Sequence, residues 1–238
     1  MSRNFELLSE IESDLDFKQT TPTSVPAATV TVPRVLHDSF RQELVSLAQV
    51  FLSQGADAPR VVALCGVDRE SGSSGICRDL GLILASRSGR PVCLIDSDSW
   101  PSRLSKILNI AVPMASFTSD AKQCIQVAPN MWYAALETCG PTGKGAPASL
   151  PGFTERVSEL RASFEFILID APGTSARTDV AMLGQIADAA ILVLEANSTR
   201  KAAALRAKKS MEAGKAKLLG TILHDRTFPI PATIYNKL

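Results

Sequence analysis

The sequence predicts an α/β protein in which a doubly wound, mostly parallel sheet carries helices on both of its faces. Short apolar runs, each typical of a strand buried on both faces, alternate with longer stretches in which apolar residues recur at helical spacing. Strands separated by helices form right-handed βαβ units, which place the strands side by side and parallel. Three of the apolar runs also end in informative polar residues: RVVALC leads into GVDRESGSSG, PVCLID into SDSWP, and FEFILID into APG.

The expected elements follow one another in a regular order along the chain. The expected strands cover residues 60–65, 91–96, 124–128, 131–136, 164–170, 189–195 and 217–223. The expected helices cover residues 36–54, 76–87, 101–109, 153–162, 178–187 and 199–213. Two Gly-rich stretches, 71–75 with Ser and 139–152 with Pro, are expected to be a turn and a loop.

Composition narrows the class of protein. The 238 residues are 45% hydrophobic and 21% charged, which is ordinary for a soluble globular chain. The formal net charge of +1 and an aromatic content of 5% argue against a nucleic-acid partner. No apolar run approaches the roughly 18 residues of a membrane helix, and the acidic start lacks the apolar run of a signal peptide. We therefore expect a cytoplasmic protein.

The first 35 residues differ in composition from the rest of the chain. Residues 4–17 have the pattern of a short acidic amphipathic helix, and residues 19–33 are rich in Thr and Pro, as a flexible linker is. The helix is either a frayed tail or a peptide that docks on a partner protein. The predicted organisation is thus a flexible tail over 1–35 and one domain over 36–238.

The cysteines point to reduced, buried thiols. Their number, five, is odd, and none of them form a CxxC pair. Cys65 and Cys93 lie inside apolar runs, where a reduced cysteine behaves as a small hydrophobic residue, and Cys77 is expected to face the core. With only two histidines in the chain, a zinc site has few ligands available.

A nucleotide-derived site is predicted at the carboxyl ends of the strands, where ligands bind in doubly wound sheets. One strand opens a Gly/Ser loop and a helix, and two others end in Asp96 and Asp170. In such a layout the loop amides and the helix N-terminus hold phosphate, while carboxylates organise Mg²⁺ and its waters. A single Asp at a strand end is commonly a turn residue, but two of them beside an SGSSG loop favour the nucleotide interpretation.

From about residue 36 onward the chain resembles the cytoplasmic kinase domain of bacterial tyrosine autokinases. These belong to polysaccharide co-polymerase systems, within the larger family of septum-placing and plasmid-partitioning P-loop ATPases. VVALCGVDRESGSSGICRDLGLILA corresponds to the family's strand, PGEGKST-type loop and helix. LIDSD matches its DxD motif with Asp96 and Asp98, LIDAPG matches IIDTPP with Asp170, and LLGTILHDR resembles LGVVLN, with His224 in place of Asn.

The resemblance implies a P-loop NTPase-like fold, with ATP and Mg²⁺ as cofactors. It implies three catalytic carboxylates, one aiding deprotonation of the tyrosine and two organising Mg²⁺, and a tail tyrosine as the phosphoacceptor. The residues that it assigns to these roles are Asp96, Asp98 and Asp170 for catalysis, Gly72, Ser73, Ser74, Gly75 and His224 for the nucleotide, Ser74, Asp98 and Asp170 for Mg²⁺, and Tyr235 as acceptor.

The chain departs from the family pattern at the loop. Ser73 stands where the loop lysine belongs, and Glu70 stands where the family has Gly. The lysine neutralises charge on the β- and γ-phosphates, so its loss should raise the barrier to phosphoryl transfer by several kcal/mol. Arg69, Arg78 or a residue from another subunit or a partner are the open replacements. The family's C-terminal tyrosine cluster is also missing.

The function that this pattern predicts is a kinase-like regulator with weak or no activity. By resemblance it acts with an inner-membrane polysaccharide co-polymerase, or chain-length regulator, in biosynthesis and export of an exopolysaccharide, capsule or adhesin polysaccharide. It would therefore be cytoplasmic but peripheral at the inner membrane through that partner. Two alternatives stay open: an active ATP-dependent tyrosine autokinase of the same system, and a partitioning-type positioning ATPase.

Two surface segments carry further alternatives. DSFRQELVSL (38–47) loosely resembles a family segment used for subunit packing, so it is either part of a homo-oligomer contact or an ordinary helix covering the sheet. The basic run over 200–217 is either a solvated helix face or a contact with acidic lipid or a partner.

Overall fold

The computed structural model describes residues 38–68, 71–97, 102–110, 124–135, 150–171 and 179–225. The strands are β1 (Val61–Gly66), β2 (Val92–Asp96), β3 (Ile125–Ala128), β4 (Met131–Ala135), β5 (Phe166–Ala171), β6 (Ala189–Glu195) and β7 (Leu218–His224). The helices are α2 (Asp38–Ser53), the 3-10 turn η1 (Gly55–Asp57), α3 (Ser73–Ser88), α4 (Arg103–Ile107), α5 (Leu150–Arg161), α6 (Asp179–Ile186) and α7 (Lys201–Ala213).

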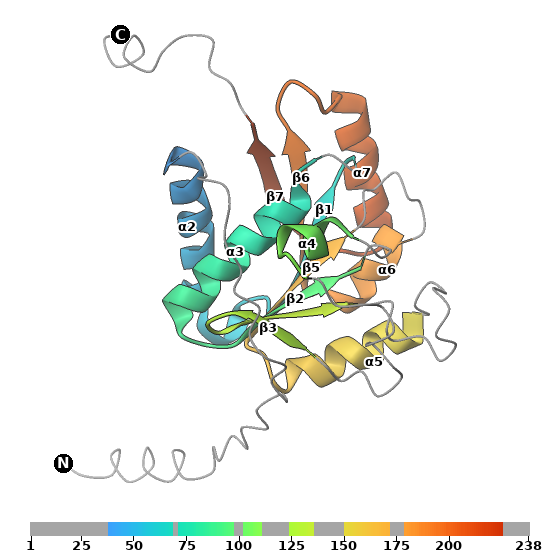
Figure 1. The fold of residues 1–238 in the computed structure, drawn as a ribbon. Coiled ribbons are helices and arrows are strands. Elements are labelled where there is room, and N and C mark those ends of the chain that lie inside the picture. Colours follow the sequence, from blue (N-terminus) through green and yellow to red (C-terminus); the bar gives the residue numbers. More distant parts are fainter. Residues whose placement is uncertain are drawn as a thin grey trace, which may run out of the picture.

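These strands form a seven-stranded sheet in the order β3-β4-β2-β5-β1-β6-β7. Every neighbouring pair is parallel except β3 with β4, which is antiparallel. Helices cover both faces: α2, α3 and α4 lie on one, and α5, α6 and α7 on the other (Figure 1). The predicted fold class, a doubly wound and mostly parallel sheet, is therefore confirmed.

Burial explains why the central strands read as continuous apolar runs. All residues of β1, β2 and β5 are buried, because helices cover both faces of the sheet there. Leu64 and Leu94 point into the core under α3, whereas Ile169 points into the core under α5 and α6. Fully burying one such side chain contributes about 1.5–3 kcal/mol, so the two cores hold the layers together.

Two expected boundaries were wrong. The turn expected over 71–75 ends at Gly72, because α3 begins at Ser73 rather than at residue 76. The loop expected over 139–152 is likewise wrong for its last three residues, since α5 begins at Leu150. Pro151 lies in the first turn of α5, where its missing N–H would have had no partner within the helix.

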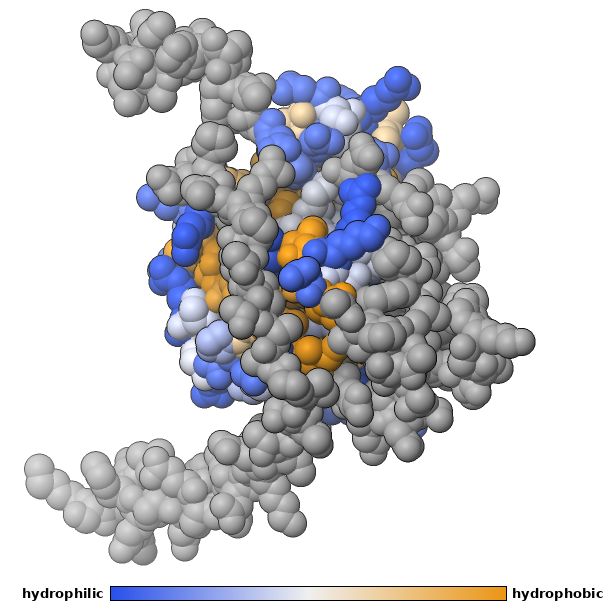
Figure 2. All heavy atoms as spheres, viewed as in Figure 1, coloured by the Kyte–Doolittle hydropathy of each residue, from blue (hydrophilic) through white to orange (hydrophobic). Residues whose placement is uncertain are grey.

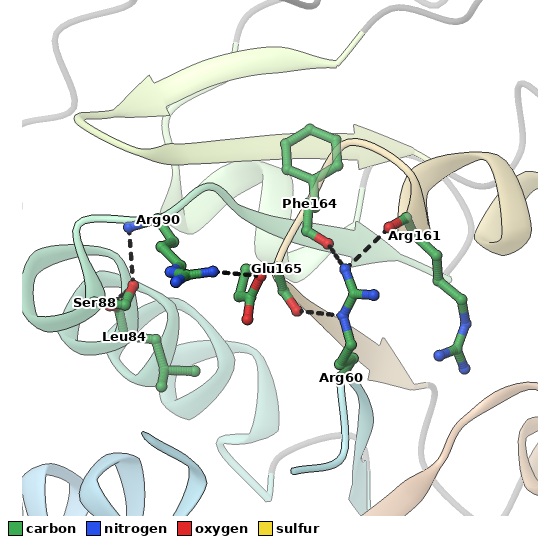
Figure 3. Close-up of polar contacts among 7 residues, drawn as sticks. All are labelled: Arg60, Leu84, Ser88, Arg90, Arg161, Phe164 and Glu165. Atoms are coloured by element: carbon green, nitrogen blue, oxygen red, sulfur yellow. Dashed lines mark hydrogen bonds and ion pairs between the residues drawn. The ribbon is translucent and has the colours of Figure 1, made fainter. Parts of the chain in front are cut away.

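Arg60, which directly precedes β1, connects elements at the amino-terminal ends of the central strands (Figure 3). Arg60 Nη2 donates to the carbonyl oxygens of Arg161 (3.0 Å) and Phe164 (2.8 Å), and Nε donates to that of Glu165 (3.1 Å). These carbonyls lie at the C-terminal end of α5 and just beyond it, where a cation is favourable. The contact fixes where α5 turns into β5.

Asp188 fastens β6 to the same edge. Its Oδ2 accepts from the backbone N–H of Arg60 (2.9 Å) and of Val61 (2.8 Å), and its Oδ1 lies 2.6 Å from Arg161 Nη2. Partial burial alone would raise the pKa of Asp188, but the hydrogen bonds from Arg161 and the two backbone amides outweigh it and lower the pKa below its usual value. The carboxylate is thus stabilised in its charged form in the folded state.

Several expectations about individual segments can be compared with the described residues. Cys65, Cys77, Cys93 and Cys124 are free and buried, as predicted for reduced thiols, while Cys139 lies outside the described residues. The basic side chains of α7 are exposed, and hydrophilic residues gather over this helix in Figure 2. Across the described ranges, no helix is long and apolar enough to span a membrane. The tail predicted over 1–35, including the helix over 4–17, lies outside these ranges, so its boundary stays a prediction.

We predict that Asp188→Asn lowers the free energy of unfolding by about 1–3 kcal/mol at pH 7. The two carboxylate oxygens accept hydrogen bonds from Arg161 and from two backbone N–H groups, and the asparagine NH₂ group, itself a donor, cannot replace one of these oxygens. The pKa of Asp188 is lower in the folded state, so its stabilisation is present above about pH 4 and is lost as pH falls through the folded-state pKa. The difference between variant and wild type should therefore shrink toward pH 3. Urea unfolding between pH 7 and pH 3 measures it.

Glu165→Gln is the matched control, because Glu165 Oε2 pairs with Arg90 Nη1 at 3.3 Å in an exposed position. Such pairs contribute about 0–1 kcal/mol, so this variant should unfold nearly as the wild type does. An equal loss in both variants would contradict the role given to Asp188.

Candidate functional site

The candidate site is built at the carboxyl end of β1, the strand between β5 and β6. β1 ends at Gly66 and α3 begins at Ser73. Between these two elements, Val67 N–H donates to Val193 O and Ser71 N–H donates to Asp68 O (both 3.2 Å). A Cβ at position 66 would collide with Ser71 Oγ. A glycine is therefore needed for the loop to fold back over the end of the strand.

Gly72 is the second glycine that the loop requires. Its φ of +74° is a left-handed conformation that side chains rarely adopt. A Cβ at this position would also lie 2.7 Å from the ring of His224, whose Nε2–H donates to the carbonyl oxygen of Ser71. Asp225 Oδ2 lies 3.6 Å from Nδ1 of the same ring. The structure thus places His224, at the end of β7, directly against the loop.

Ser73, which the resemblance aligns with the loop lysine of the kinases, is the first residue of α3. Its hydroxyl donates to Asp170 Oδ1 at 3.2 Å, so the loop and the end of β5 are in contact. The side chain of Ser74 follows in the same first turn and is buried, and Asp170 itself is only 4% exposed. Where a lysine would bring a positive charge to this carboxylate, the chain has a neutral hydroxyl.

Asp96 ends β2 directly opposite Asp170 in the parallel register of β2 and β5. It is 1% exposed, and its Oδ2 accepts from Tyr133 Oη (2.9 Å) and from Ser102 Oγ. Ser102 in turn caps α4 by accepting from Ser105 N–H. Burial, followed by the charge of Asp96, raises the pKa of Tyr133 well above its usual value, so the phenol stays protonated and donates.

This network was missed at the sequence level. Tyr133 stands in the apolar run MWYAA, which gives no sign of its partner, and Ser102 follows the DxD-like segment without a recognisable motif. Its consequence is that Asp96 makes structural hydrogen bonds with β4 and α4. The role predicted for Asp96, aiding deprotonation of a tyrosine, has no support in these contacts, and it remains an untested prediction.

Arg78 was one open replacement for the loop lysine. Its Nε and Nη2 lie 2.7 and 2.6 Å from Oδ1 of the neighbouring Asp79, and both side chains are buried. Burial raises the pKa of Asp79, while Arg78 and, more weakly, Arg41 of α2 act in the opposite direction. Arg78 is thus engaged by its own neighbour, and Arg69 lies outside the described residues.

The pKa values of two buried thiols near the loop, those of Cys65 and Cys77, are raised by burial and by nearby carboxylates. Burial raises the pKa of Cys65 to about 12, with the charge of Asp170 adding to the shift. Burial also raises the pKa of Cys77 well above its usual value, and Asp170, Asp96 and Asp79 all act in the same direction. Two buried carboxylates, Asp96 and Asp170, lie side by side at this end of the sheet, and a phosphate bound beside them would need a cation to offset their charge.

Several predicted positions lie outside the described residues. These are the loop residues Arg69 and Glu70, the second acidic residue of the DxD-like motif, Asp98, and the tail tyrosine, Tyr235. The structure brings together the rest of the predicted set at one edge of the sheet: Gly72, Ser73, Ser74, Gly75, Asp96, Asp170 and His224.

A loop that joins a buried strand to a helix, beside carboxylates on neighbouring parallel strands, defines the class of P-loop-type α/β proteins. Comparisons agree. Over 163 residues the chain is 29% identical to the tyrosine-protein kinase YwqD of Bacillus subtilis, covering 65% of this chain and 68% of the relative. Over 178 residues it is 26% identical to the tyrosine-protein kinase CpsD of Streptococcus agalactiae, covering 69% and 74%. No family model matches the chain.

Solved structures show the same fold. The kinase domain of the Escherichia coli tyrosine kinase ETK superposes with a TM-score of 0.64 at 11% identity, covering 80% of this chain and 79% of that one. The VpsO kinase domain gives a TM-score of 0.59 at 20% identity, covering 80% and 98%. MinD of Pyrococcus horikoshii, complexed with Mg-ADP, gives 0.54 at 19% identity, covering 75% and 76%. The resemblance to bacterial tyrosine kinases and MinD-type ATPases is therefore confirmed.

We predict that Gly72→Ala destabilises the protein through two separable effects. The left-handed backbone costs about 1–2 kcal/mol for a residue with a Cβ, and the contact with the His224 ring adds a steric penalty. In a His224→Ala background the steric part should disappear, so the cost of Gly72→Ala should become smaller there. Urea unfolding of the four chains of this double-mutant cycle measures both effects.

Gly75→Ala is the matched control, because this glycine lies inside α3 and a Cβ there meets nothing within 4 Å. Because Gly75 lies in the first turn of α3, its replacement by alanine should leave the stability unchanged or raise it by at most about 0.5–1 kcal/mol. If Gly72→Ala cost the same in both His224 backgrounds, the proposed contact between the ring and the loop would be refuted.

Proposed function

We propose that this chain is a kinase-like, nucleotide-binding regulator with weak or no phosphoryl transfer. In this proposal it acts in the biosynthesis and export of an extracellular polysaccharide. The observation that carries the proposal is the hydrogen bond from Ser73 to Asp170, since a neutral hydroxyl stands where the related kinases place a cation. The tyrosine-protein kinases named among the relatives support the kinase-like part.

The residues present fit a bound phosphate in part. The 16-residue helix α3 presents its N-terminus at the end of β1, and its first-turn N–H groups and positive dipole end favour an anion. The Ser74 hydroxyl and the Asp170 carboxylate are the described oxygen donors that suit Mg²⁺. ATP with Mg²⁺, when bound, would supply the phosphoryl group, and Mg²⁺ would offset part of the negative charge around the loop.

The same residues fit phosphoryl transfer poorly. A catalytic cation stabilises the charge that develops on the transferred group, and Ser73 cannot supply one. Arg78 is held by Asp79 in the described structure, and the carboxylates of Asp96 and Asp170 at the strand ends would repel a polyphosphate. We therefore propose that the chain keeps a cradle for phosphate and has lost most of the turnover.

The proposed partner is an inner-membrane polysaccharide co-polymerase, which would hold this chain peripherally at the membrane. The support is the resemblance to tyrosine kinases of such systems, together with a relative and a fold neighbour that carry tyrosine-kinase names. A cation from the cytosolic segment of that partner, or from a second copy, would offset part of the negative charge around the loop and so tighten nucleotide binding in the complex. The partitioning-type ATPase is a second candidate only through its fold, which the MinD structures share.

We predict that the full chain binds ATP with Mg²⁺ weakly, with a dissociation constant of about 1 mM, which corresponds to roughly 4 kcal/mol. Ser73→Lys should tighten binding at least tenfold, because it places a charge-assisted donor beside the phosphates. Ser73→Ala is the matched control and should stay within about threefold of the wild type. Isothermal titration calorimetry measures all three. If neither the wild type nor Ser73→Lys bound ATP, the nucleotide-binding part of the proposal would be wrong.

Phosphotyrosine blotting after incubation with ATP separates the proposal from the active autokinase. The wild type should give no signal above a sample without ATP, either alone or with the cytosolic segment of the co-polymerase. A signal that disappears in Tyr235→Phe would overturn the proposal in favour of an active autokinase. Tighter ATP binding in the presence of the partner segment would support the regulator, whereas no response to that segment would argue against this partner.

A further inference from the structure

Positive charge is concentrated in one segment of the chain, residues 200–217, which hold α7. This segment contains seven basic residues and one acidic residue, so its formal net charge is +6. The whole chain carries +1, and the remaining residues together therefore carry −5. So uneven a distribution gives the molecule one strongly positive surface. All seven basic residues are exposed: Arg200, Lys201, Arg206, Lys208, Lys209, Lys215 and Lys217.

α7 presents an exposed leucine in the middle of this positive surface. Ala207 and Met211 are buried and face the core, whereas Leu205 is 49% exposed. Lys201 precedes Leu205 by four residues and Lys209 follows it by four, so all three lie on the same side of the helix. The outward face of α7 is thus an apolar side chain flanked along the helix by lysines.

Little of the charge on this face is neutralised within the described residues. The acidic residue of the segment, Glu212, lies 3.5 Å from Lys208 Nζ, and both side chains are about half exposed. In the described ranges no carboxylate forms an ion pair with Lys201, Arg206 or Lys209. Their charge is therefore available to an anion outside the molecule.

We propose that the outward face of α7 binds an anionic membrane surface directly. The basic side chains contact the phosphates of the lipid headgroups, and Leu205 enters the boundary between headgroups and acyl chains. Each basic side chain near such a surface contributes about a fivefold gain in affinity. This contact goes beyond the proposed function, because it requires neither a nucleotide nor the co-polymerase.

The chemistry of the face favours lipid over nucleic acid. Both partners offer phosphates, but only the membrane offers an apolar region for an exposed leucine. Single-stranded nucleic acids are held largely by stacking of their bases on aromatic side chains, and residues 200–217 contain no aromatic residue. A lipid surface therefore accounts for both the charge and Leu205.

The place of α7 in the fold suits this contact. α5, α6 and α7 cover one face of the sheet, whereas α2, α3 and α4 cover the other (Figure 1). A membrane lying against α7 would therefore leave the helices of the opposite face, including the start of α3 in the candidate site, turned away from it. We expect membrane binding to be the same with and without ATP.

Co-sedimentation of the full chain with lipid vesicles measures the contact. Vesicles of phosphatidylcholine with about 40% phosphatidylglycerol should bind the chain with an apparent dissociation constant of about 1 mM lipid, the affinity that four basic side chains provide. Binding should fall at least tenfold between about 50 mM and about 500 mM salt, and vesicles of phosphatidylcholine alone should not bind. A chain that did not bind the anionic vesicles at low salt would overturn the proposal, whether or not it binds ATP.

Charge reversal tests whether α7 is the surface involved. The double variant Lys201→Glu with Lys209→Glu should bind anionic vesicles at least 25-fold more weakly, because it replaces two attractions by two repulsions. The matched control is Arg87→Glu with Lys106→Glu, which makes the same change in net charge at exposed positions on α3 and α4. This control should stay within about threefold of the wild type. An equal loss in both double variants would show that overall charge, rather than α7, attracts the vesicles, and would overturn the proposal.

Leu205→Ser separates the membrane from a nucleic acid. It should weaken vesicle binding about two- to fivefold at low and at high salt alike, since the apolar contribution is not screened. The thermal unfolding midpoint checks that this variant and both double variants are folded. Fluorescence anisotropy with a short DNA duplex of mixed sequence provides the comparison. Tighter binding to the duplex than to the vesicles, or vesicle binding that Leu205→Ser leaves unchanged, would contradict the lipid assignment.

Discussion

The parallel pairing of β2 and β5 on one side and of β5 and β1 on the other is the constraint on which the site depends. It places Asp96 and Asp170 side by side at the sheet edge from which the loop leaves β1. Carboxylates so close together and so deeply buried need hydrogen-bond donors, and the chain provides Tyr133 and Ser102 for one and Ser73 for the other. The side chains of both carboxylates are thus hydrogen-bonded, as buried polar groups in folded proteins are.

The two ends of the sheet are organised by different means. At the amino end, Arg60 and Asp188 join the start of β1 to the end of α5 and the start of β6 through charge-assisted hydrogen bonds to backbone groups. At the carboxyl end, glycines and short polar side chains allow the backbone to turn tightly against His224. The first arrangement fixes the start of β1, and the second brings the first-turn backbone N–H groups of α3 to the end of β1.

Much of the fold could be predicted from the sequence, because the central strands are buried on both faces and therefore appear as uninterrupted apolar runs such as FILI over residues 166–169. The start of α3 could not, since Ser73 and Ser74 have the composition of a turn and only the left-handed Gly72 marks the true boundary. The P-loop layout predicted that the Ser/Gly loop lies beside Asp170, although not the particular hydrogen bond from Ser73. The partner of Asp96 did not, because Tyr133 is 37 residues away on a strand whose place beside β2 is set by the tertiary fold.

The position of Cys77 has a practical consequence. Its thiol is fully buried in α3, one turn beyond Ser73, and its pKa is raised by burial and by the nearby carboxylates. A thiol in this state reacts extremely slowly with alkylating reagents, since both access and ionisation are denied to it. Its modification rate is therefore a built-in chemical reporter of how often the loop and the first turns of α3 open to solvent.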